Sequence, residues 1–360
     1  MKPSSSETPS QGGYLMPAEW HPHASTWLTW PTNRITWPGE RLERVRDAYL
    51  MMIQALLEHE GVDLLVHDEE TAQSVRRRVG KVGANPEALR THIIPTVDGW
   101  IRDYGPNFLI HPTDPDRPVA FNKWEFNAWG NKYPDLALDN AVVDGLSRHL
   151  PGRMFRPKVV LEGGSIDVNG RGLCLTTRQC LLNPNRNPDL SRECIEDLLK
   201  SYLNVERVIW LDEGVVGDDT DGHIDDIARF AAPDIVVCAV EEDPTDANFP
   251  MLKANHETLC HLSTQEDLFG IVSLPMPEPV VDGGERLPAS YANFYIANGL
   301  VLVPVFGQER DRSALDILQG VFPGRRVLGI PATDMVYGLG AVHCLTQQQP
   351  QASSLVPCPE

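Results

Sequence analysis

The residues most able to do chemistry gather in one stretch, residues 217–226, which reads Gly-Asp-Asp-Thr-Asp-Gly-His-Ile-Asp-Asp. Its histidine, His223, stands among five acids, which are Asp218, Asp219, Asp221, Asp225 and Asp226. Carboxylates this close in sequence repel one another unless a cation lies among them. The cation could be a metal ion, an arginine of the protein or a positively charged substrate. The rest of the sequence bears on which of the three it is.

A cysteine near the C-terminus is the second candidate. Cys344 lies in Ala-Val-His-Cys-Leu-Thr-Gln-Gln-Gln-Pro, after a glycine-containing loop. By default a cysteine is a small, buried and inert side chain. A nucleophilic cysteine needs a base that is near in space but need not be near in sequence, and the acidic stretch supplies His223. On an extended backbone His343 points the other way, so we expect it to be the weaker base.

A metal site is the main rival interpretation of the acidic stretch. If extended, the chain puts His223 and Asp225 on one face, which suits a metal as well as a cationic substrate. An EF-hand loop beginning at Asp219 fails because Ile224 stands where glycine is needed. No His-Glu-x-x-His motif is present, and His-x-Asp alone is a weak zinc signal. A metal-dependent amidohydrolase using Asp219, Asp221, His223 and Asp225 is kept as an alternative hypothesis.

Two further acids and two tryptophans lie close to glycines. Asp103 follows Trp100 in Trp-Ile-Arg-Asp-Tyr-Gly-Pro, and Glu162 begins Glu-Gly-Gly-Ser. Taken singly, each acid is more often a turn or capping residue. Trp100, and Trp129 in Phe-Asn-Ala-Trp-Gly, are ordinarily core aromatics. Their functional interpretation is a wall along an alkyl chain or beneath a planar cation.

The elements that must position these residues follow a repeated pattern. Apolar residues at three-to-four spacing predict helices over residues 40–60, 69–79, 135–150, 190–203, 250–262 and 311–318. Strands are predicted over 62–67, 91–97, 108–110, 119–121, 158–161, 166–168, 173–177, 206–211, 227–230, 235–240, 268–274, 291–296, 300–305 and 326–329. Because strands come in hairpin pairs, we expect an α/β fold of repeated ββαβ modules and not a doubly wound sheet. Such repeats indicate a propeller-like arrangement whose module ends converge on one central site.

Composition sets limits on partners and location. The 360 residues are 42% hydrophobic, enough for a sizeable core, and no low-complexity break forces two domains. A formal charge of −19 disfavours nucleic acid and anionic membrane as partners. The sequence shows no secretory signal and no apolar run of about 20 residues, so we expect the cytoplasm. Seven cysteines without a Cys-x-x-Cys pair indicate neither a disulfide framework nor a zinc ribbon. Residues 1–13 are expected to form a disordered tail.

Six segments carry a family resemblance. They are Trp-Ile-Arg-Asp-Tyr-Gly-Pro at 100–106, Phe-Asn-Ala-Trp-Gly at 126–130, Leu-Glu-Gly-Gly-Ser at 161–165, Asp-Gly-His-Ile-Asp at 221–225, Ala-Ser-Tyr-x-Asn-Phe at 289–294 and His-Cys-Leu-Thr-Gln-Gln-Gln-Pro at 343–350. In this order they resemble the agmatine deiminase family, which is grouped with bacterial-type peptidylarginine deiminases. The resemblance implies a five-bladed α/β propeller of ββαβ modules, the guanidino-group-modifying enzyme fold, with no metal and no cofactor. It also implies a single deiminase domain over residues 14–350, followed by a C-terminal tail over 351–360.

The same resemblance assigns roles to the candidate residues. Asp103 and Asp225 would hold a planar guanidinium on its edges, while the Cys344 thiolate attacks its carbon. His223 would protonate the departing ammonia and then activate water, with Glu162 orienting the water or the substrate. In this interpretation the substrate is the cation that the acidic stretch requires.

Departures from the family pattern leave the exact guanidine open. The family's glutamate for the far amine of agmatine corresponds to the shorter Asp219, and Asp221 replaces an asparagine. Leu339 and Ala341 change the loop that carries the nucleophile. Agmatine is favoured over arginine because an α-carboxylate needs a basic partner, and only Arg102 stands inside the motifs.

The predicted activity is therefore the hydrolysis of agmatine to N-carbamoylputrescine and ammonia. The alternatives are a deiminase of another guanidine, such as peptidyl-arginine or a related alkylguanidine, and a non-catalytic binder of polyamines or guanidines. The partner is expected to be a small cationic guanidine. Because the family often forms dimers or higher assemblies, a homo-oligomer is also expected.

Overall fold

The computed structural model describes residues 7–352; residues 1–6 and 353–360, where parts of the two expected tails fall, lie outside it. The described part of the N-terminal tail contacts helix α7 (Arg192–Leu203), since Ser10 N donates a hydrogen bond to Ser201 O at 3.1 Å. Pro9 to Gly13 form turns. This part of the chain thus differs from the disordered tail that its Ser- and Gly-rich composition predicts.

A three-strand pattern repeats four times inside the chain. In each repeat the first two strands pair antiparallel and the second pairs parallel with the third, with helical structure between the last two. This is the ββαβ module that the sequence predicts. The strands are β4 (Asn107–Ile110), β5 (Val119–Asn122) and β6 (Arg153–Phe155); β7 (Asp167–Val168), β8 (Leu173–Thr177) and β9 (Arg207–Leu211); β10 (Ala228–Ala232), β11 (Ile235–Val240) and β12 (Gly270–Pro275); and β15 (Tyr295–Ala297), β16 (Leu300–Val305) and β17 (Arg326–Pro331).

Both ends of the chain build the fifth module. Its strand order is β18 (Thr346–Pro350), β1 (His23–Thr29), β2 (Gly61–Val66) and β3 (Leu89–Ile93). β18 pairs antiparallel with β1, and β1 pairs parallel with β2. The sequence pattern predicts neither β1 nor β18; β18 reads Thr-Gln-Gln-Gln-Pro, which has only one residue typical of a strand. Because this pairing is antiparallel, the start of β18, just after Cys344, lies beside the end of β1, with Thr346 opposite Leu28.

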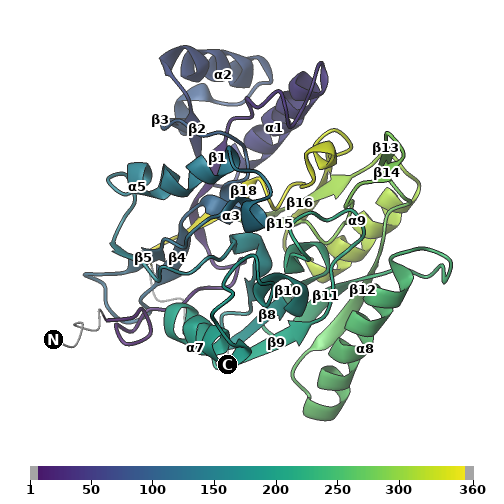
Figure 1. Ribbon diagram of the computed structural model, residues 1–360. Helices are drawn as coiled ribbons and strands as arrows, with labels where there is room; N and C mark the ends of the chain where they lie inside the picture. Colours follow the sequence, from purple (N-terminus) through teal and green to yellow (C-terminus); the bar gives the residue numbers. More distant parts are fainter. Residues whose placement is uncertain (1–6, 353–360) are drawn as a thin grey trace.

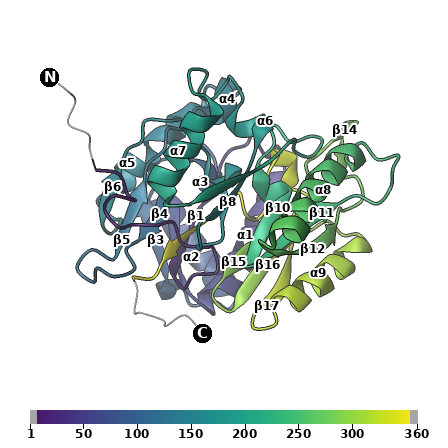
Figure 2. The same ribbon diagram turned by 90° about the horizontal axis from the view of Figure 1, so that it is seen from below.

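Figure 1 shows helices at the periphery, with β1, β4, β8, β10, β15 and β18 nearer the middle. Seen from below, α8 and α9 lie on one side of the molecule and α5 on the other (Figure 2). The helices are α1 (Arg41–Leu57), α2 (Glu69–Lys81), α3 (Ile101–Tyr104), α4 (Ala128–Asn131), α5 (Val142–Leu146), α6 (Arg178–Leu181), α7, α8 (Phe249–Glu266) and α9 (Arg310–Val321). A short hairpin, β13 (Val281–Asp282) and β14 (Glu285–Arg286), stands apart from the five sheets.

Helix α1 illustrates how the sequence fixes an element. Leu42, Val45, Tyr49, Met52 and Leu56 recur every three or four residues, and all five are buried. Each fully buried apolar side chain of this size contributes roughly 1.5–3 kcal/mol, so packing on the neighbouring sheet, more than intrinsic propensity, stabilises the helix. The prediction of a helix over residues 40–60 is confirmed.

Two predicted elements are wrong. The helix expected over 135–150 is a 3₁₀ helix, Leu136–Ala141, followed by the short α5, because the buried Asp139 carboxylate turns away to accept the N–H groups of Val97 and Asp98. The strand expected over 158–161 is reduced to a single parallel bridge between Val160 and Glu125, and the N–H and C=O of Val160 are bonded to the Asn187 side chain. Strand β6 takes its place in the sheet.

The architecture is a mixed α/β fold of five sheets. Backbone pairing defines each sheet without joining the sheets to one another in a ring, so the five-bladed propeller stays a prediction. Across residues 7–352, no helix has the length and apolar character needed to cross a bilayer.

Candidate active site

Asp103 lies on α3, a single helical turn that ends at Gly105 and Pro106. Its buried carboxylate accepts the Gly164 N–H at 3.0 Å and the indole N–H of Trp129 at 2.9 Å. Trp129 has φ of +54°, a left-handed conformation that is unfavourable for a bulky residue. Burial, followed by the charges of Asp225 and Glu162, raises the pKa of Asp103 well above its usual value. This carboxylate is therefore held in place but lacks a cation.

Glu162 precedes a 3₁₀ turn, Gly163–Ser165, that brings it under Asp103. Its Oε1 accepts a hydrogen bond from Arg186 Nε at 2.6 Å, and its Oε2 has no partner. Burial raises the pKa of Glu162 although Arg186 opposes the shift. No local pattern marks Arg186, because it lies in a Pro- and Asn-rich loop and reaches a glutamate 24 positions away.

The Asp218 carboxylate holds the backbone of the acidic stretch in a turn. Its carboxylate accepts the N–H groups of Thr220, Gly222 and His223 at 2.7, 2.8 and 3.1 Å. Ile224–Asp226 then form a 3₁₀ turn, so the extended geometry expected for residues 223–225 is wrong. The turn nevertheless directs His223 and Asp225 into the same buried region.

His223 carries both ring nitrogens into the interior without a hydrogen-bond partner. Its Nδ1 lies 3.8 Å from Asp103 Oδ1, and the side chain is 1% exposed. Burial lowers the pKa of His223 to about 3, against the opposing charge of Asp225. The imidazole is therefore neutral at physiological pH and able to accept a proton.

Asp225 and Cys344 lie in contact. Asp225 Oδ2 is 3.7 Å from Cys344 Sγ and accepts a hydrogen bond from His343 Nδ1 at 2.6 Å, while Oδ1 has no partner. Burial acts to raise the pKa of Asp225, but the hydrogen bond and charge of His343 outweigh it and lower the pKa. His343 therefore does not point away from the site as expected, because residues 342–345 form turns and not an extended strand.

The Cys344 thiol is buried and uncharged in the free protein. Burial, then the charges of Asp225, Asp226 and Asp103, raises its pKa well above the usual value. Asn293 Nδ2 lies 3.1 Å from the sulfur, and Asn293 Oδ1 accepts the His343 N–H at 2.9 Å. Asn293 belongs to a segment that the sequence analysis singled out, but without a role for this residue.

Cations of the protein balance part of the acidic stretch. Asp221 accepts hydrogen bonds from Arg186 at 2.6 Å and from Lys132 Nζ at 2.8 Å. Lys132 Nζ also lies 3.1 Å from Asp219 Oδ1, and the Tyr133 hydroxyl donates to Asp219 Oδ2. Of the three cations considered from the sequence, an arginine of the protein is the one that pairs with Asp221. Asp219 is likewise paired and does not present a free carboxylate.

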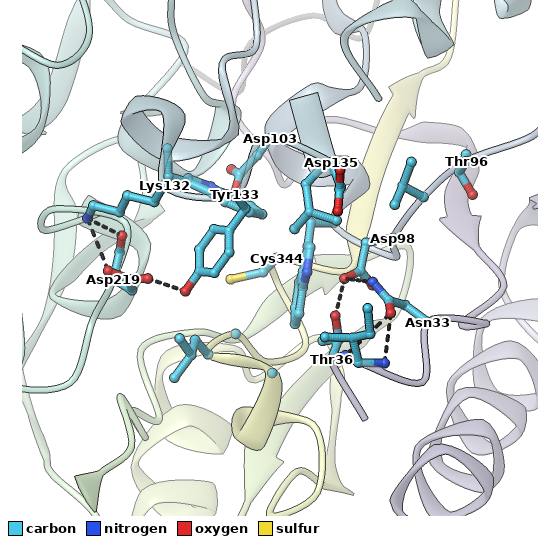
Figure 3. Close-up of a pocket in the computed structure, with 18 of the residues that line it drawn as sticks. Asn33, Thr36, Thr96, Asp98, Asp103, Lys132, Tyr133, Asp135, Asp219 and Cys344 are labelled. Atoms are coloured by element: carbon cyan, nitrogen blue, oxygen red, sulfur yellow. Dashed lines mark hydrogen bonds and ion pairs between the residues drawn. The ribbon is translucent and has the colours of Figure 1, made fainter. Parts of the chain in front are cut away.

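A cavity of about 950 Å³ opens over Cys344 and Asp103. Its lining includes all three residues expected to bind substrate, which are Trp100, Trp129 and Asp219. Figure 3 shows Cys344 between two polar groups, one formed by Lys132, Tyr133 and Asp219 and the other by Asn33, Thr36 and Asp98. Leu339 also lines the cavity, at φ +70°. Cys344 and Asp103 thus line this opening, whereas His223, Asp225 and Glu162 are buried and do not line it.

The structure regroups the candidate metal ligands. Of the described residues, Glu162, Cys180 and His223 have potential ligand atoms within 4.8 Å of one another. This set differs from the group of four considered from the sequence, of which only His223 is a member. Because Arg186 is already bonded to Glu162, a guanidinium occupies the place beside these donors. The donor set is therefore a poor fit for a resident metal ion.

Known proteins match this chain over almost its whole length. A curated relative named putative agmatine deiminase, from Legionella pneumophila (strain Philadelphia 1), is 40% identical over 352 residues, which is 97% of this chain and 98% of the relative. A solved structure described as the putative arginine deiminase from Porphyromonas gingivalis is 36% identical with a TM-score of 0.84, covering 94% of this chain and 99% of that one. The agmatine deiminase of Enterococcus faecalis is 31% identical with a TM-score of 0.86, covering 98% and 100%.

The fold is thus the mixed α/β fold of guanidino-group-modifying enzymes. The family described as Porphyromonas-type peptidyl-arginine deiminase matches residues 15–350. The chain belongs to this family, and the resemblance inferred from the six segments is confirmed.

Proposed function

We propose that the protein is an agmatine deiminase, which hydrolyses agmatine to N-carbamoylputrescine and ammonia through Cys344. The observation that carries the proposal is the pair of buried carboxylates, Asp103 and Asp225, near the Cys344 sulfur; Asp103 and Cys344 also line the open cavity. Neither carboxylate has a lysine or arginine of the protein on it, and Asp225 Oδ1 has no partner at all. A guanidinium offers a planar edge of N–H donors to each carboxylate.

Binding of such a cation would lower the pKa of the Cys344 thiol and so favour the nucleophilic thiolate. The carboxylates of Asp225, Asp226 and Asp103 raise the pKa of the Cys344 thiol in the free protein. A guanidinium between them offsets these charges, so the thiolate becomes accessible only when substrate is present. The neutral His223 then takes the thiol proton.

The covalent steps follow from this arrangement. The Cys344 thiolate attacks the guanidinium carbon, a C–S bond forms, and the C=N electron pair moves onto nitrogen. His223 gives its proton to the leaving nitrogen, the C–N bond breaks, and ammonia departs. Water attacks the remaining amidino-thioether as His223 removes its proton, the C–S bond breaks, and the ureido product leaves. Glu162, with its free Oε2, would orient the water.

The cavity supports agmatine over arginine. Arg102, the basic residue that an α-carboxylate would need, is buried and bonded to Gln348, His343 O and Glu19, away from the cavity. The ammonium group of Lys132 is already paired with Asp219 and Asp221. Among the described lining residues, the exposed Arg34 is the remaining lysine or arginine. The size of the cavity keeps a larger guanidine, such as peptidyl-arginine, as the second candidate.

The proposal extends to the whole molecule. The five sheets would be the blades of a five-bladed α/β propeller around the site. The protein would act in the cytoplasm on a small cationic guanidine, as a homo-oligomer.

Ammonia release tests the proposal. Agmatine, arginine and a peptidyl-arginine are compared for the wild type, for Cys344→Ser and for Cys174→Ser, a matched change of another buried, free cysteine. Release from agmatine alone, lost in Cys344→Ser and kept in Cys174→Ser, supports the proposal. Release only from another guanidine keeps the mechanism and changes the substrate.

Two further outcomes separate the alternative hypotheses. Loss of ammonia release on treatment with a chelator would support the metal-dependent amidohydrolase. No release from any guanidine, with Cys344 unreactive toward a thiol label even when a guanidine is bound, would leave a non-catalytic binder.

A further inference from the structure

His343 lies between two carboxylates. Its Nδ1 is 2.6 Å from Asp225 Oδ2, its Nε2 is 2.8 Å from Glu19 Oε2, and the residue is 2% exposed. A neutral imidazole has one N–H and one lone pair, so one carboxylate would face a lone pair. Only the imidazolium donates at both nitrogens. An imidazolium between two carboxylates therefore satisfies both contacts at once.

The charges around Glu19 support the same assignment. Glu19 also lies 3.0 Å from Arg229 Nη2 and 3.4 Å from Arg102 Nη2, and it accepts the Ile296 N–H at 2.8 Å. Arg229 in turn pairs with Asp167. These cations and His343 hold the pKa of Glu19 well below its usual range despite burial.

With His343 charged, the buried network balances. Three cations, which are Arg102, Arg229 and His343, face three anions, which are Glu19, Asp167 and Asp225. With His343 neutral, the network would carry an uncompensated negative charge in the interior. Such a charge is strongly unfavourable.

The same residue fixes which edge of Asp225 faces the substrate. His343 occupies Oδ2, so Oδ1 remains for a guanidinium N–H. The main chain of His343 is held by Asn293, whose side-chain amide also touches the Cys344 sulfur. One segment thus positions both the carboxylate and the nucleophile.

We propose that His343 is a positioning residue: as an imidazolium held between Glu19 and Asp225, it keeps Asp225 ionised and aimed at the guanidinium. This inference rests on the proposed function for its kinetic test but not for its spectroscopic one. His343 does not exchange protons with the substrate, so its part is distinct from that of His223.

Kinetics with His343→Asn provide the first test, because asparagine can still donate to Asp225 but carries no charge. The groups that face Asp225 from all sides are His343, His223, Arg229, Asp103, Asp218, Asp226 and Cys344. Without the imidazolium, burial and the neighbouring acids raise the pKa of Asp225. The ionised form is then lost at a higher pH on acidification, so the acid limb of kcat/KM moves to higher pH.

The expected size and the controls are as follows. KM for the guanidine rises about 10- to 100-fold, the range typical of residues that orient a site group from behind. Glu19→Gln moves both KM and the acid limb in the same direction. His92→Asn, which removes another histidine hydrogen-bonded to an aspartate, leaves both unchanged. An unmoved acid limb in His343→Asn contradicts the proposal.

Nitrogen-15 NMR of the histidine rings gives a second test. Its wild-type measurement needs neither activity nor a folded variant. At pH 7.5, a value chosen about one unit above the ordinary histidine pKa, the wild-type His343 ring should show two protonated nitrogens, whereas His223 should be neutral. In Glu19→Gln the His343 signal should shift toward the neutral ring. A neutral His343 in the wild type overturns the inference, whereas an inactive protein with a charged His343 overturns only the proposed function.

Discussion

Gly164 stands where a side chain would fill the site. A Cβ at this position would lie 2.6 Å from His223 Nδ1, 2.9 Å from Asp103 Oδ1 and 3.0 Å from Asp225 Oδ2. These atoms belong to the two acids and the imidazole that are proposed to act on the guanidinium. The absence of a side chain is therefore what leaves room for a ligand between the acids and the imidazole.

Gly164→Ala is expected to lower kcat/KM by at least about 100-fold, because a misplacement of about 1 Å in a site is enough for such a loss. The free energy of unfolding, measured by thermal denaturation, should fall by no more than the roughly 1–3 kcal/mol typical of an inserted methyl group. Gly320→Ala on α9, where a Cβ meets nothing within 4 Å, is the matched control and should leave activity unchanged. Wild-type kinetics in Gly164→Ala would show that the guanidinium binds elsewhere.

The reactivity of Cys344 provides a second prediction at this scale. Because burial and three carboxylates raise the pKa of its thiol, the thiolate fraction at any pH lies below that of an ordinary cysteine. We expect alkylation of Cys344 to be slower than that of the exposed Cys194 at pH 7 and to keep rising above pH 9. Peptide mass spectrometry after timed alkylation measures both rates. Faster alkylation of Cys344 than of Cys194 in the free protein would exclude activation by the substrate.

At the scale of elements, α4 and the acidic loop are joined by Lys132. This lysine follows α4 and reaches Asp219 and Asp221, 87 and 89 residues away. Burial acts against the charge of Lys132, but its two carboxylate partners raise its pKa. Asp219 is therefore held by Lys132 and Tyr133 and does not extend toward a ligand.

Lys132→Met is expected to free Asp219 and to lower KM for agmatine about five-fold, the equivalent of about 1 kcal/mol for an exposed ion pair. The gain arises because the ammonium of agmatine replaces the lost lysine. An alkylguanidine without the far amine serves as the control ligand and should show no gain. Equal changes for both ligands would mean that Asp219 does not meet the amine.

How far the sequence predicts the molecule also depends on the element. Periodicity is sufficient for α1 and for the repeated modules, because local apolar spacing determines them. It fails for β18, whose glutamines form a strand only because β1 lies beside them. Spacing marked Cys344 and His223, yet it could not mark Arg186, Asn293 or Glu19. Their roles depend on contacts between segments that only the fold brings together.

At the scale of the whole molecule, the charge of −19 is a long-range attraction for a cation. Raising the ionic strength from about 0.01 M to about 1 M shortens the screening length from about 30 Å to about 3 Å. We expect kcat/KM for agmatine to fall several-fold over this range, mainly through KM. Steady-state ammonia release at each salt concentration measures the effect. A salt-independent kcat/KM would mean that only contacts inside the cavity attract the substrate.

The composition of the fifth sheet has a consequence for how the protein folds during its synthesis on the ribosome. Its last strand, β18, is laid against its first, β1, and the residues just ahead of these strands are His343, Cys344 and Glu19. A ribosome-bound chain that has reached β17 already contains Glu19, Arg102 and Arg229 but neither the imidazolium that balances them nor the sulfur. Such a chain lacks the sulfur proposed to attack a guanidine, and it also lacks the histidine proposed to balance its buried charges. The proposed catalytic centre would thus be the last part of the molecule to assemble, and truncated products of translation are expected to be inert.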